Sequence, residues 1–137
     1  MKNEKLVRSI AEKVRKQCET FAFSKAAGGY DFNRHYDLAC MCAVASHALL
    51  TALKKKKIPC KMIRGEYDLD GHCWLVVHDH IVDITATQFG IKEEVYVAKD
   101  NEMYVAEAYV KSCRSIGFGK RQNPTRKLTN RILAIKV

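Results

Sequence analysis

Residues 71–89 read GHCWLVVHDHIVDITATQF, and this stretch decides the fold. It holds two runs rich in β-branched and aromatic residues, 72–78 and 81–86, which are typical of strands. We expect a turn through Asp79 and His80 and an antiparallel pairing of the two runs. The stretch therefore predicts a β-hairpin, and its polar residues need an explanation of their own.

Polar side chains interrupt both predicted strands. Because side chains alternate along a strand, His72 shares a face with Trp74, and Asp83 shares one with Ile81. His72 and Asp83 are 11 residues apart on consecutive strands, so the hairpin brings them within cross-strand reach. A purely structural sheet has no need of an ionisable pair among apolar neighbours. The arrangement predicts an imidazole that is oriented by a carboxylate.

Two segments upstream predict helices. Residues 4–23 place apolar side chains at spacings of three and four, which indicates an amphipathic helix. Residues 38–55, LACMCAVASHALLTALKK, are rich in Ala and Leu, and we expect them to form the central buried helix with Asp37 as its N-cap. Paired glycines in residues 26–37 predict a loop between the two helices.

The remaining segments complete an α+β fold. The patterns predict a strand at 60–67, a turn at 68–71, a loop at 117–130, and a terminal strand or frayed end at 131–137. Residues 91–110 are ambiguous, because EEVYVAK at 93–99 suggests a strand and NEMYVAEAYVKSC at 101–113 a helix capped by Asn101; we assign a helix to 91–110. The expected architecture is a central helix packed on an antiparallel sheet.

The length of 137 residues predicts a single domain, 1–137, with its core in residues 38–90. The charged start lacks the apolar stretch of a secretory signal, and no run reaches the roughly 18 apolar residues of a membrane span. We therefore expect a soluble, cytoplasmic protein that does not bind membranes. In that compartment the six cysteines stay as thiols, which favours thiol chemistry over a disulfide framework.

The net charge of +9 belongs to the C-terminal end of the chain. Residues 111–137 hold eight of the 24 Lys and Arg residues and no Asp or Glu. A basic segment attracts nucleic acid or an acidic protein surface equally well, although such runs are most often solvated surface. This segment also lacks the interleaved aromatic residues that single-strand binders use.

A nucleophilic thiol would complete the chemistry of the hairpin. Cys40 and Cys42 lie near the start of the predicted central helix, where the positive end of the helix dipole lowers a thiol pKa. A thiol nucleophile needs a base, and the base needs a third group to orient it. His72 and Asp83 supply both, so Cys, His and Asp converge if the sheet packs against the start of the helix.

The motifs CAVASHALL, GHCWLVV and IVDITATQF resemble those of transglutaminase-like, papain-like-fold cysteine hydrolases, and especially small bacterial and phage members. The resemblance covers residues 38–90, outside which lie the N-terminal helix and the basic segment. In that family a helix-borne cysteine precedes a histidine strand and an aspartate strand. The resemblance therefore implies covalent thiol catalysis without a metal or an organic cofactor.

Carried over by position, the family pattern falls on Cys42 as the nucleophile, His72 as the base and Asp83 as the orienting acid. Trp74 matches the aromatic residue two positions after the histidine, and we expect it to contribute to substrate binding. Gln88 completes the TATQF end of the motif, where we expect it to line the substrate site.

Two positions fit the family pattern less well. Relatives often carry glycine two residues before the nucleophile, where this chain has Cys40, which could be a resolving thiol or a metal ligand. For the oxyanion hole, the backbone N–H of Cys42 is one expected donor, and Asn33 or another backbone group is the second.

The other cysteines and histidines have simpler explanations. A zinc site would draw its ligands from three pairs, Cys40 and Cys42, His72 and Cys73, and His78 and His80. The spacing argues against it, because helical pairs with one intervening residue diverge by about 200° and adjacent strand residues point to opposite faces. We therefore expect no metal site. His78 and His80 flank the predicted turn and are expected to face solvent, whereas three cysteines without such neighbours are expected in the core. Those three are Cys18, Cys60 and Cys113.

These observations predict a cysteine-dependent acyl-transfer enzyme of the peptidase, deamidase or transglutaminase type. Its expected substrate is a protein or peptide, and the basic segment favours an acidic one. The alternative is a non-catalytic module of hydrolase-like fold that binds nucleic acid or an acidic protein through residues 111–137.

Overall fold

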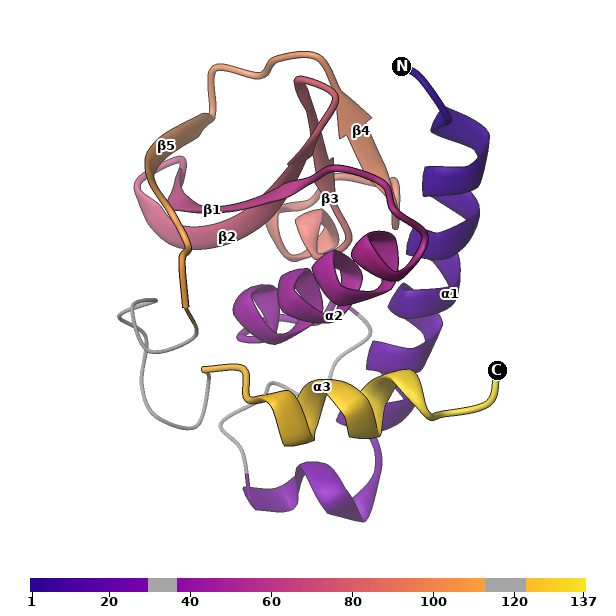
Figure 1. The fold of residues 1–137 in the computed structure, drawn as a ribbon. Helices are drawn as coiled ribbons and strands as arrows, with labels where there is room; N and C mark the ends of the chain where they lie inside the picture. The colour runs from indigo at the N-terminus through magenta and orange to yellow at the C-terminus, as the bar shows by residue number, and fades with distance from the viewer. Residues whose placement is uncertain (30–36, 113–122) are drawn as a thin grey trace.

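The computed structural model describes residues 1–29, 37–112 and 123–137, which form an α+β fold of helices and one antiparallel sheet (Figure 1). The elements, in chain order, are α1 (Glu4–Ala22), the 3₁₀ turn η1 (Lys25–Gly29), α2 (Cys42–Lys55), β1 (Lys61–Tyr67), β2 (Asp70–Val77), β3 (His80–Asp83), the 3₁₀ turn η2 (Ala86–Phe89), β4 (Tyr96–Ala98), β5 (Tyr104–Tyr109) and α3 (Arg126–Leu133).

The five strands pair antiparallel in the order β4-β3-β2-β1-β5. Two-residue turns connect β1 to β2 and β2 to β3, and all four turn residues have positive φ. Such turns match the right-handed twist of the strands they join. The predicted hairpin is present, but its turn is His78-Asp79 rather than Asp79-His80, because His80 pairs with Val77 as the first residue of β3. The turn between β1 and β2 is Asp68-Leu69, which is shorter than the predicted turn at 68–71.

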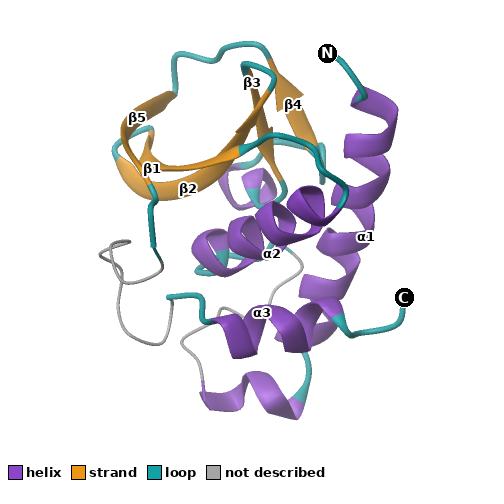
Figure 2. Ribbon diagram, viewed as in Figure 1, coloured by secondary structure: helices purple, strands orange, loops and turns teal. Residues whose placement is uncertain are grey.

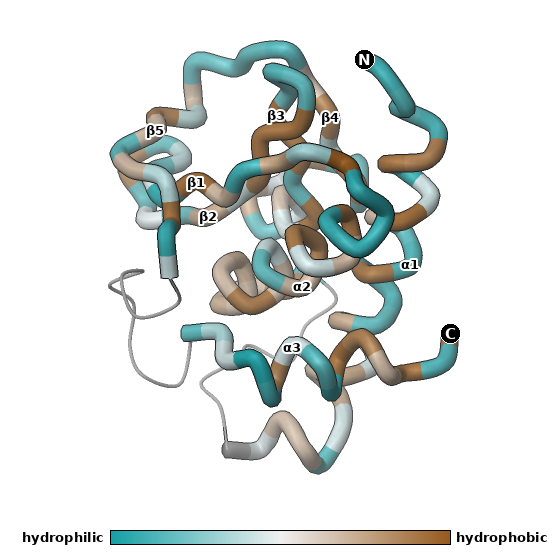
Figure 3. The backbone as a smooth tube through the Cα atoms, in the orientation of Figure 1, coloured by the Kyte–Doolittle hydropathy of each residue, from teal (hydrophilic) through white to brown (hydrophobic). Residues whose placement is uncertain are grey.

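Helix α2 lies between the sheet and α3, while α1 runs along its side (Figures 1 and 2). Apolar residues from all these elements meet around it, which explains why this Ala-rich helix is buried on most of its surface (Figure 3). The main contributors are Val7, Ala11 and Val14 of α1, Ala45, Leu49 and Leu53 of α2, Leu75 and Val77 of β2, and Leu128 and Ile132 of α3. The prediction of a central buried helix is confirmed.

The start of α2 differs from the prediction. Leu38 and Cys40 adopt left-handed backbone conformations, with φ of 57° and 67°, so the helix begins at Cys42 and not at residue 38. Asp37 does not cap it, because its Oδ1 accepts a hydrogen bond from the N–H of Ala39 at 3.1 Å. Left-handed residues other than glycine are strained. That strained turn makes Cys42 the first residue of the helix.

Residues 91–110 form strands β4 and β5, so the predicted helix is wrong. β4 pairs with β3 and β5 pairs with β1, which places them at opposite edges of the sheet. Asn101, the expected cap of that helix, instead accepts from the N–H of Met103 through its side chain at 2.9 Å. Backbone pairing with distant strands outweighs the modest helix preference of the segment.

Helix α3 extends to Leu133, so the terminal strand predicted as one alternative at 131–137 is wrong, whereas residues 134–137 have no regular secondary structure, as a frayed end would. Thr125 caps the helix, since its hydroxyl accepts from the N–H of Leu128 at 3.0 Å. Part of the loop predicted at 117–130 is therefore helical, and its residues 117–122 lie outside the described ranges. Within those ranges, none of the helices has the length and apolarity needed to cross a membrane.

The sheet curls strongly away from α2. Tyr96 of β4 and Tyr104 of β5, from opposite edges, stack with ring centroids 5.9 Å apart. The concave face encloses a small second core of Ile63, Trp74 and Ile81. This curvature brings the side chains of both edge strands close to the start of β2, where His72 lies.

Candidate active site

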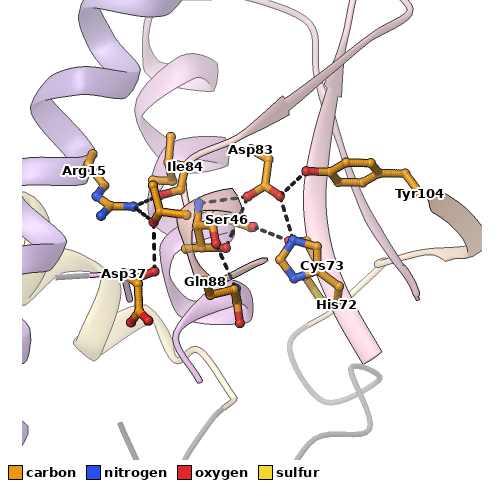
Figure 4. A network of polar contacts seen from close by, with 11 residues as sticks. Arg15, Asp37, Ser46, His72, Cys73, Asp83, Ile84, Gln88 and Tyr104 are labelled. Carbon is orange, nitrogen blue, oxygen red and sulfur yellow. Dashed lines mark hydrogen bonds and ion pairs between the residues drawn. The ribbon is translucent and has the colours of Figure 1, made fainter. Parts of the chain in front are cut away.

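His72 and Asp83 form a buried pair on the concave face of the sheet. Nε2 of His72 donates to Oδ2 of Asp83 at 2.6 Å (Figure 4). Both side chains are fully buried, so water does not compete with the contact. The cross-strand contact predicted from the hairpin is present.

The carboxylate of Asp83 accepts from four donor groups. Its Oδ1 accepts from the backbone N–H and the hydroxyl of Thr85, at 2.8 and 3.1 Å, and its Oδ2 accepts from Tyr104 at 2.8 Å as well as from His72. Burial disfavours the ionised carboxylate, but the His72 imidazolium and these donors outweigh it and hold the pKa of Asp83 below its usual range. Asp83 is therefore an anion held in one orientation.

Aromatic rings enclose the imidazole of His72. Trp74 stacks on it at 5.8 Å between centroids, Phe89 meets it edge-on at 4.7 Å, and Tyr104 lies tilted at 6.1 Å. Burial disfavours the imidazolium, yet attraction by Asp83 and by Cys42 raises the pKa of His72 to about 9. Its Nδ1 is buried and makes no hydrogen bond within the described residues, so this nitrogen is free for the thiol.

Cys42 begins α2 with only 8% of its surface exposed. Interaction with the thiol of Cys73 is the largest influence on the pKa of Cys42. Burial opposes ionisation, but the interactions with His72 add to that of Cys73, and the pKa of Cys42 falls to about 5. The unpaired N–H groups of the first helical turn favour an anion at the same place.

Cys73 stays a neutral donor beside Cys42. Interaction with Cys42 and burial both raise the pKa of Cys73 far above its usual range. The Cys73 carbonyl also accepts from the hydroxyl of Ser46 at 3.2 Å, one helical turn after Cys42. That bond joins the second turn of α2 to β2, next to the position of Cys42.

A buried arginine links the segment that carries Asp83 to the segment that leads into Cys42. Arg15 of α1 is 2% exposed and donates to the carbonyl of Ile84 at 2.7 Å and to Oγ1 of Thr87 at 2.9 Å (Figure 4). The Thr87 hydroxyl in turn donates to the carbonyl of Asp37 at 3.1 Å. Glu19 pairs with Arg15 at 2.7 Å. Arg15 therefore links the segment that follows Asp83 to the turn that precedes Cys42.

The expected substrate-binding residues have different surroundings. Trp74 is 2% exposed and supports the imidazole from the concave face. Gln88 is half-buried, and its Nε2 donates to the carbonyl of Thr85 at 3.0 Å, so it braces η2 beside the site. Asn33, the expected second oxyanion donor, lies outside the described residues.

The other cysteines separate according to burial. Cys40 is exposed, while Cys18 is buried and Cys60 is half-buried, so the core prediction is confirmed for Cys18 and is only partly right for Cys60. Cys113 lies outside the described residues. Among the residues that are described, no group of three or more His, Cys, Asp or Glu side chains could hold a metal ion.

His78 and His80 are half-buried, so the prediction that they face solvent is only partly right. Nδ1 of His80 donates to the carbonyl of His78 at 2.8 Å, which closes the hairpin turn. The basic segment 111–137 is also less separate from the core than predicted, because α3 buries Leu128 and Ile132 beneath its basic residues.

Sequence reasoning missed two members of this site. Tyr104 was hidden by the predicted helix at 91–110, although its alternating run YVAEAY is also compatible with a strand. Cys73 was considered only as a metal ligand, and its contact with Cys42 depends on how α2 packs on β2. No family model, curated protein sequence or solved structure matches this chain.

Proposed function

We propose that this protein is a cysteine-dependent acyl-transfer enzyme with a papain-like or transglutaminase-like core. Cys42 is the nucleophile, His72 the acid and base, and Asp83 the group that orients the imidazole. One observation carries the proposal: the imidazole of His72 binds Asp83 through Nε2, while its buried Nδ1 has no partner at hydrogen-bond distance among the described residues, and Cys42 at the start of α2 interacts with the same imidazole. A structural core does not need this combination.

The chemistry begins from the thiolate of Cys42 and the imidazolium of His72. The thiolate attacks an amide carbonyl and forms a C–S bond, and the carbonyl electron pair moves to oxygen. The backbone N–H of Cys42 donates to that oxyanion. Nδ1–H of His72 then gives its proton to the leaving nitrogen as the C–N bond breaks, which leaves a thioester and a neutral imidazole.

The second half-reaction restores the enzyme. Neutral His72 takes a proton from water or from an amine, which attacks the thioester carbonyl and releases Cys42 as a thiolate. Water makes the protein a peptidase, or a deamidase if the amide is a Gln side chain, and an amine makes it a transglutaminase. Every step uses side chains of this chain, and the proposed mechanism has no metal or organic cofactor.

Product analysis with a control variant that lacks only the Cys42 thiol tests this proposal. The wild-type protein and Cys42→Ala are incubated with a proteome, and ammonia release, new peptide termini and isopeptide crosslinks are measured. Cys60→Ala is a matched control because that thiol is half-buried and remote from His72 in the contacts described. We expect one product class that depends on Cys42 and survives in Cys60→Ala. Identical products from wild type and Cys42→Ala would contradict the proposal.

A further inference from the structure

Tyr104 makes a contact that the proposed chemistry does not yet use. Its hydroxyl donates to Oδ2 of Asp83 at 2.8 Å, and this is the same oxygen that accepts from His72. The other carboxylate oxygen is taken by Thr85. Tyr104 therefore competes with His72 for the charge on one atom, whereas Thr85 holds the opposite side of the carboxylate.

The hydroxyl is held in place by the packing of its ring. Tyr67 and Trp74 meet the ring edge-on at 4.9 and 5.1 Å, and Tyr96 stacks on it at 5.9 Å. A ring enclosed on several sides has little freedom to move its hydroxyl. Burial and the neighbouring Asp83 also raise the pKa of Tyr104, so the hydroxyl keeps its proton and remains a donor.

A close backbone approach lets β5 reach the site. The pairing of β1 with β5 shifts register between Arg64 and Gly65. A Cβ on Gly65 would lie 2.1 Å from the carbonyl oxygen of Val105 and 2.8 Å from the ring of Trp74. Only glycine fits between these two groups. In the pairing of β1 with β2, Gly65 lies opposite His72. The close approach of β5 to β1 therefore occurs next to His72.

We propose that Tyr104 is a positioning residue that tunes the proton affinity of His72 by sharing Oδ2 of Asp83. This inference rests on the proposed function, because it assigns a role within the same triad. The positive end of the Tyr104 hydroxyl dipole faces Oδ2, and it weakens the hold of that oxygen on the imidazolium. Tyr104 thereby keeps His72 acidic enough to give its proton to the leaving nitrogen.

The groups that could titrate near His72 come from every element around it. Asp83 of β3 and Cys42 of α2 are the charged neighbours, and Cys73 lies beside Cys42. The phenols of Tyr67, Tyr96 and Tyr104 come from β1, β4 and β5. A change confined to the Tyr104 hydroxyl leaves all the others in place.

Nuclear magnetic resonance of the full chain tests this inference without a substrate. The ¹⁵N resonances of the His72 ring, assigned by comparison with His72→Gln, are followed through the titration in wild type, Tyr104→Phe and Tyr96→Phe. Tyr96→Phe is the matched control, because it removes a hydroxyl from the stacked ring that accepts from Asn101 and does not contact Asp83.

In Tyr104→Phe we expect the titration midpoint of His72 to rise by about half a pH unit, and in Tyr96→Phe we expect no change. With substrate, we expect kcat of Tyr104→Phe to fall about 3- to 10-fold at unchanged KM, since a more basic imidazole is a weaker acid. An unshifted midpoint in Tyr104→Phe, or an equal shift in Tyr96→Phe, would overturn the inference.

Site-specific difluorotyrosine at position 104 gives a second test that keeps the ring and strengthens the donor. We expect it to lower the His72 midpoint, opposite to Tyr104→Phe, and a rise or no change would contradict the role. These titrations need no turnover. The two proposals therefore fail separately: an unchanged His72 titration removes the role of Tyr104, and the absence of Cys42-dependent products removes the proposed function.

Discussion

Nε2 of His72 lies 2.6 Å from Oδ2 of Asp83, and both side chains are fully excluded from solvent. A buried ion pair of this kind is rarely retained for stability alone, because removing two charges from water costs several kcal/mol per ion. Here Thr85 and Tyr104 supply additional hydrogen bonds to the carboxylate, so the anion is fully satisfied. Four donors on one aspartate favour chemistry at the neighbouring imidazole, and the following experiments test that chemistry.

The Cys42 thiol is expected to react with iodoacetamide at pH 6 faster than any other thiol of the described residues. With a pKa of about 5 it is mostly thiolate at this pH, whereas an ordinary thiol, with a pKa near 8.5, is almost fully protonated. Mass spectrometry of tryptic peptides locates the label. Cys40→Ala serves as the control, since Cys40 is the exposed cysteine among the described residues. Preferential labelling of Cys40 at this pH would argue against an activated Cys42.

The activity is expected to follow a bell-shaped pH profile. Cys42 must lose its proton, which it does as pH rises through about 5, and His72 must keep its proton, which it loses as pH rises through about 9. Activity should therefore rise with pH near 5, stay high around neutrality and fall near 9. The measurement is kcat/KM against pH. Activity that keeps rising from pH 8 to above pH 10 would show that the imidazolium is not required.

Asp83→Asn should keep the shape of the side chain and remove its charge. The pKa of His72 then falls towards or below its ordinary value, because burial remains and the main attraction is lost. We expect kcat to fall by roughly 10²- to 10⁴-fold. Thr87→Ser, which keeps the hydroxyl contacts of η2 with Arg15 and Asp37, is the control and should stay near wild type. Near-wild-type kcat in Asp83→Asn would exclude the orienting role.

Arg15→Met should destabilise the fold and loosen the site together. The substitution removes the donor to Ile84 and Thr87 and leaves Glu19 unpaired, so we expect a loss of about 3–5 kcal/mol in the free energy of unfolding. Urea unfolding measures it. Lys16→Met changes the next residue of the same helix, which is exposed, and should stay within about 0.5 kcal/mol of wild type. Equal effects of both substitutions would contradict the linking role of Arg15.

Gly65→Ala should push β5 away from β1. The added methyl group meets the backbone of Val105, which cannot yield as a side-chain end could, so we expect a loss of about 1–3 kcal/mol or more. Amide hydrogen exchange should increase in residues 104–109. Val105→Ala, an exposed change on the same strand, is the comparison and should leave the exchange nearly unchanged. Full protection of β5 in Gly65→Ala would show that the close approach is not required.

Some features of this protein follow from local sequence. Helix α1, strands β1 and β2 and the contact of His72 with Asp83 depend on apolar periodicity and on one short hairpin. Neighbouring residues determine such features, because a period of 3.6 or 2 specifies the buried face before any distant segment is placed. Residue types and their order along the chain therefore predict a Cys, His and Asp set, and the family resemblance favours Cys42 over Cys40 within it.

Other features needed the folded chain. Strands β4 and β5 exist because β3 and β1 offer them backbone partners, and no local preference at residues 91–110 specifies that pairing. The left-handed turn at Leu38 and Cys40, held through Thr87 and Asp37, decides that the helix starts at Cys42. Distant contacts of this kind leave no periodic pattern in the sequence.

The sequence by itself determined the chemistry of the three candidate catalytic residues and the local hairpin that joins two of them. Tertiary structure alone decided which groups surround that set. Cys73 interacts with Cys42, and Arg15 donates to the carbonyl of Ile84, which follows Asp83. Tyr104 donates to the same oxygen of Asp83 that accepts from His72. The physical reason is that hydrogen bonds and burial act across space. Tyr104 reaches Asp83 because the sheet curls until tyrosine rings from its two edge strands stack on each other.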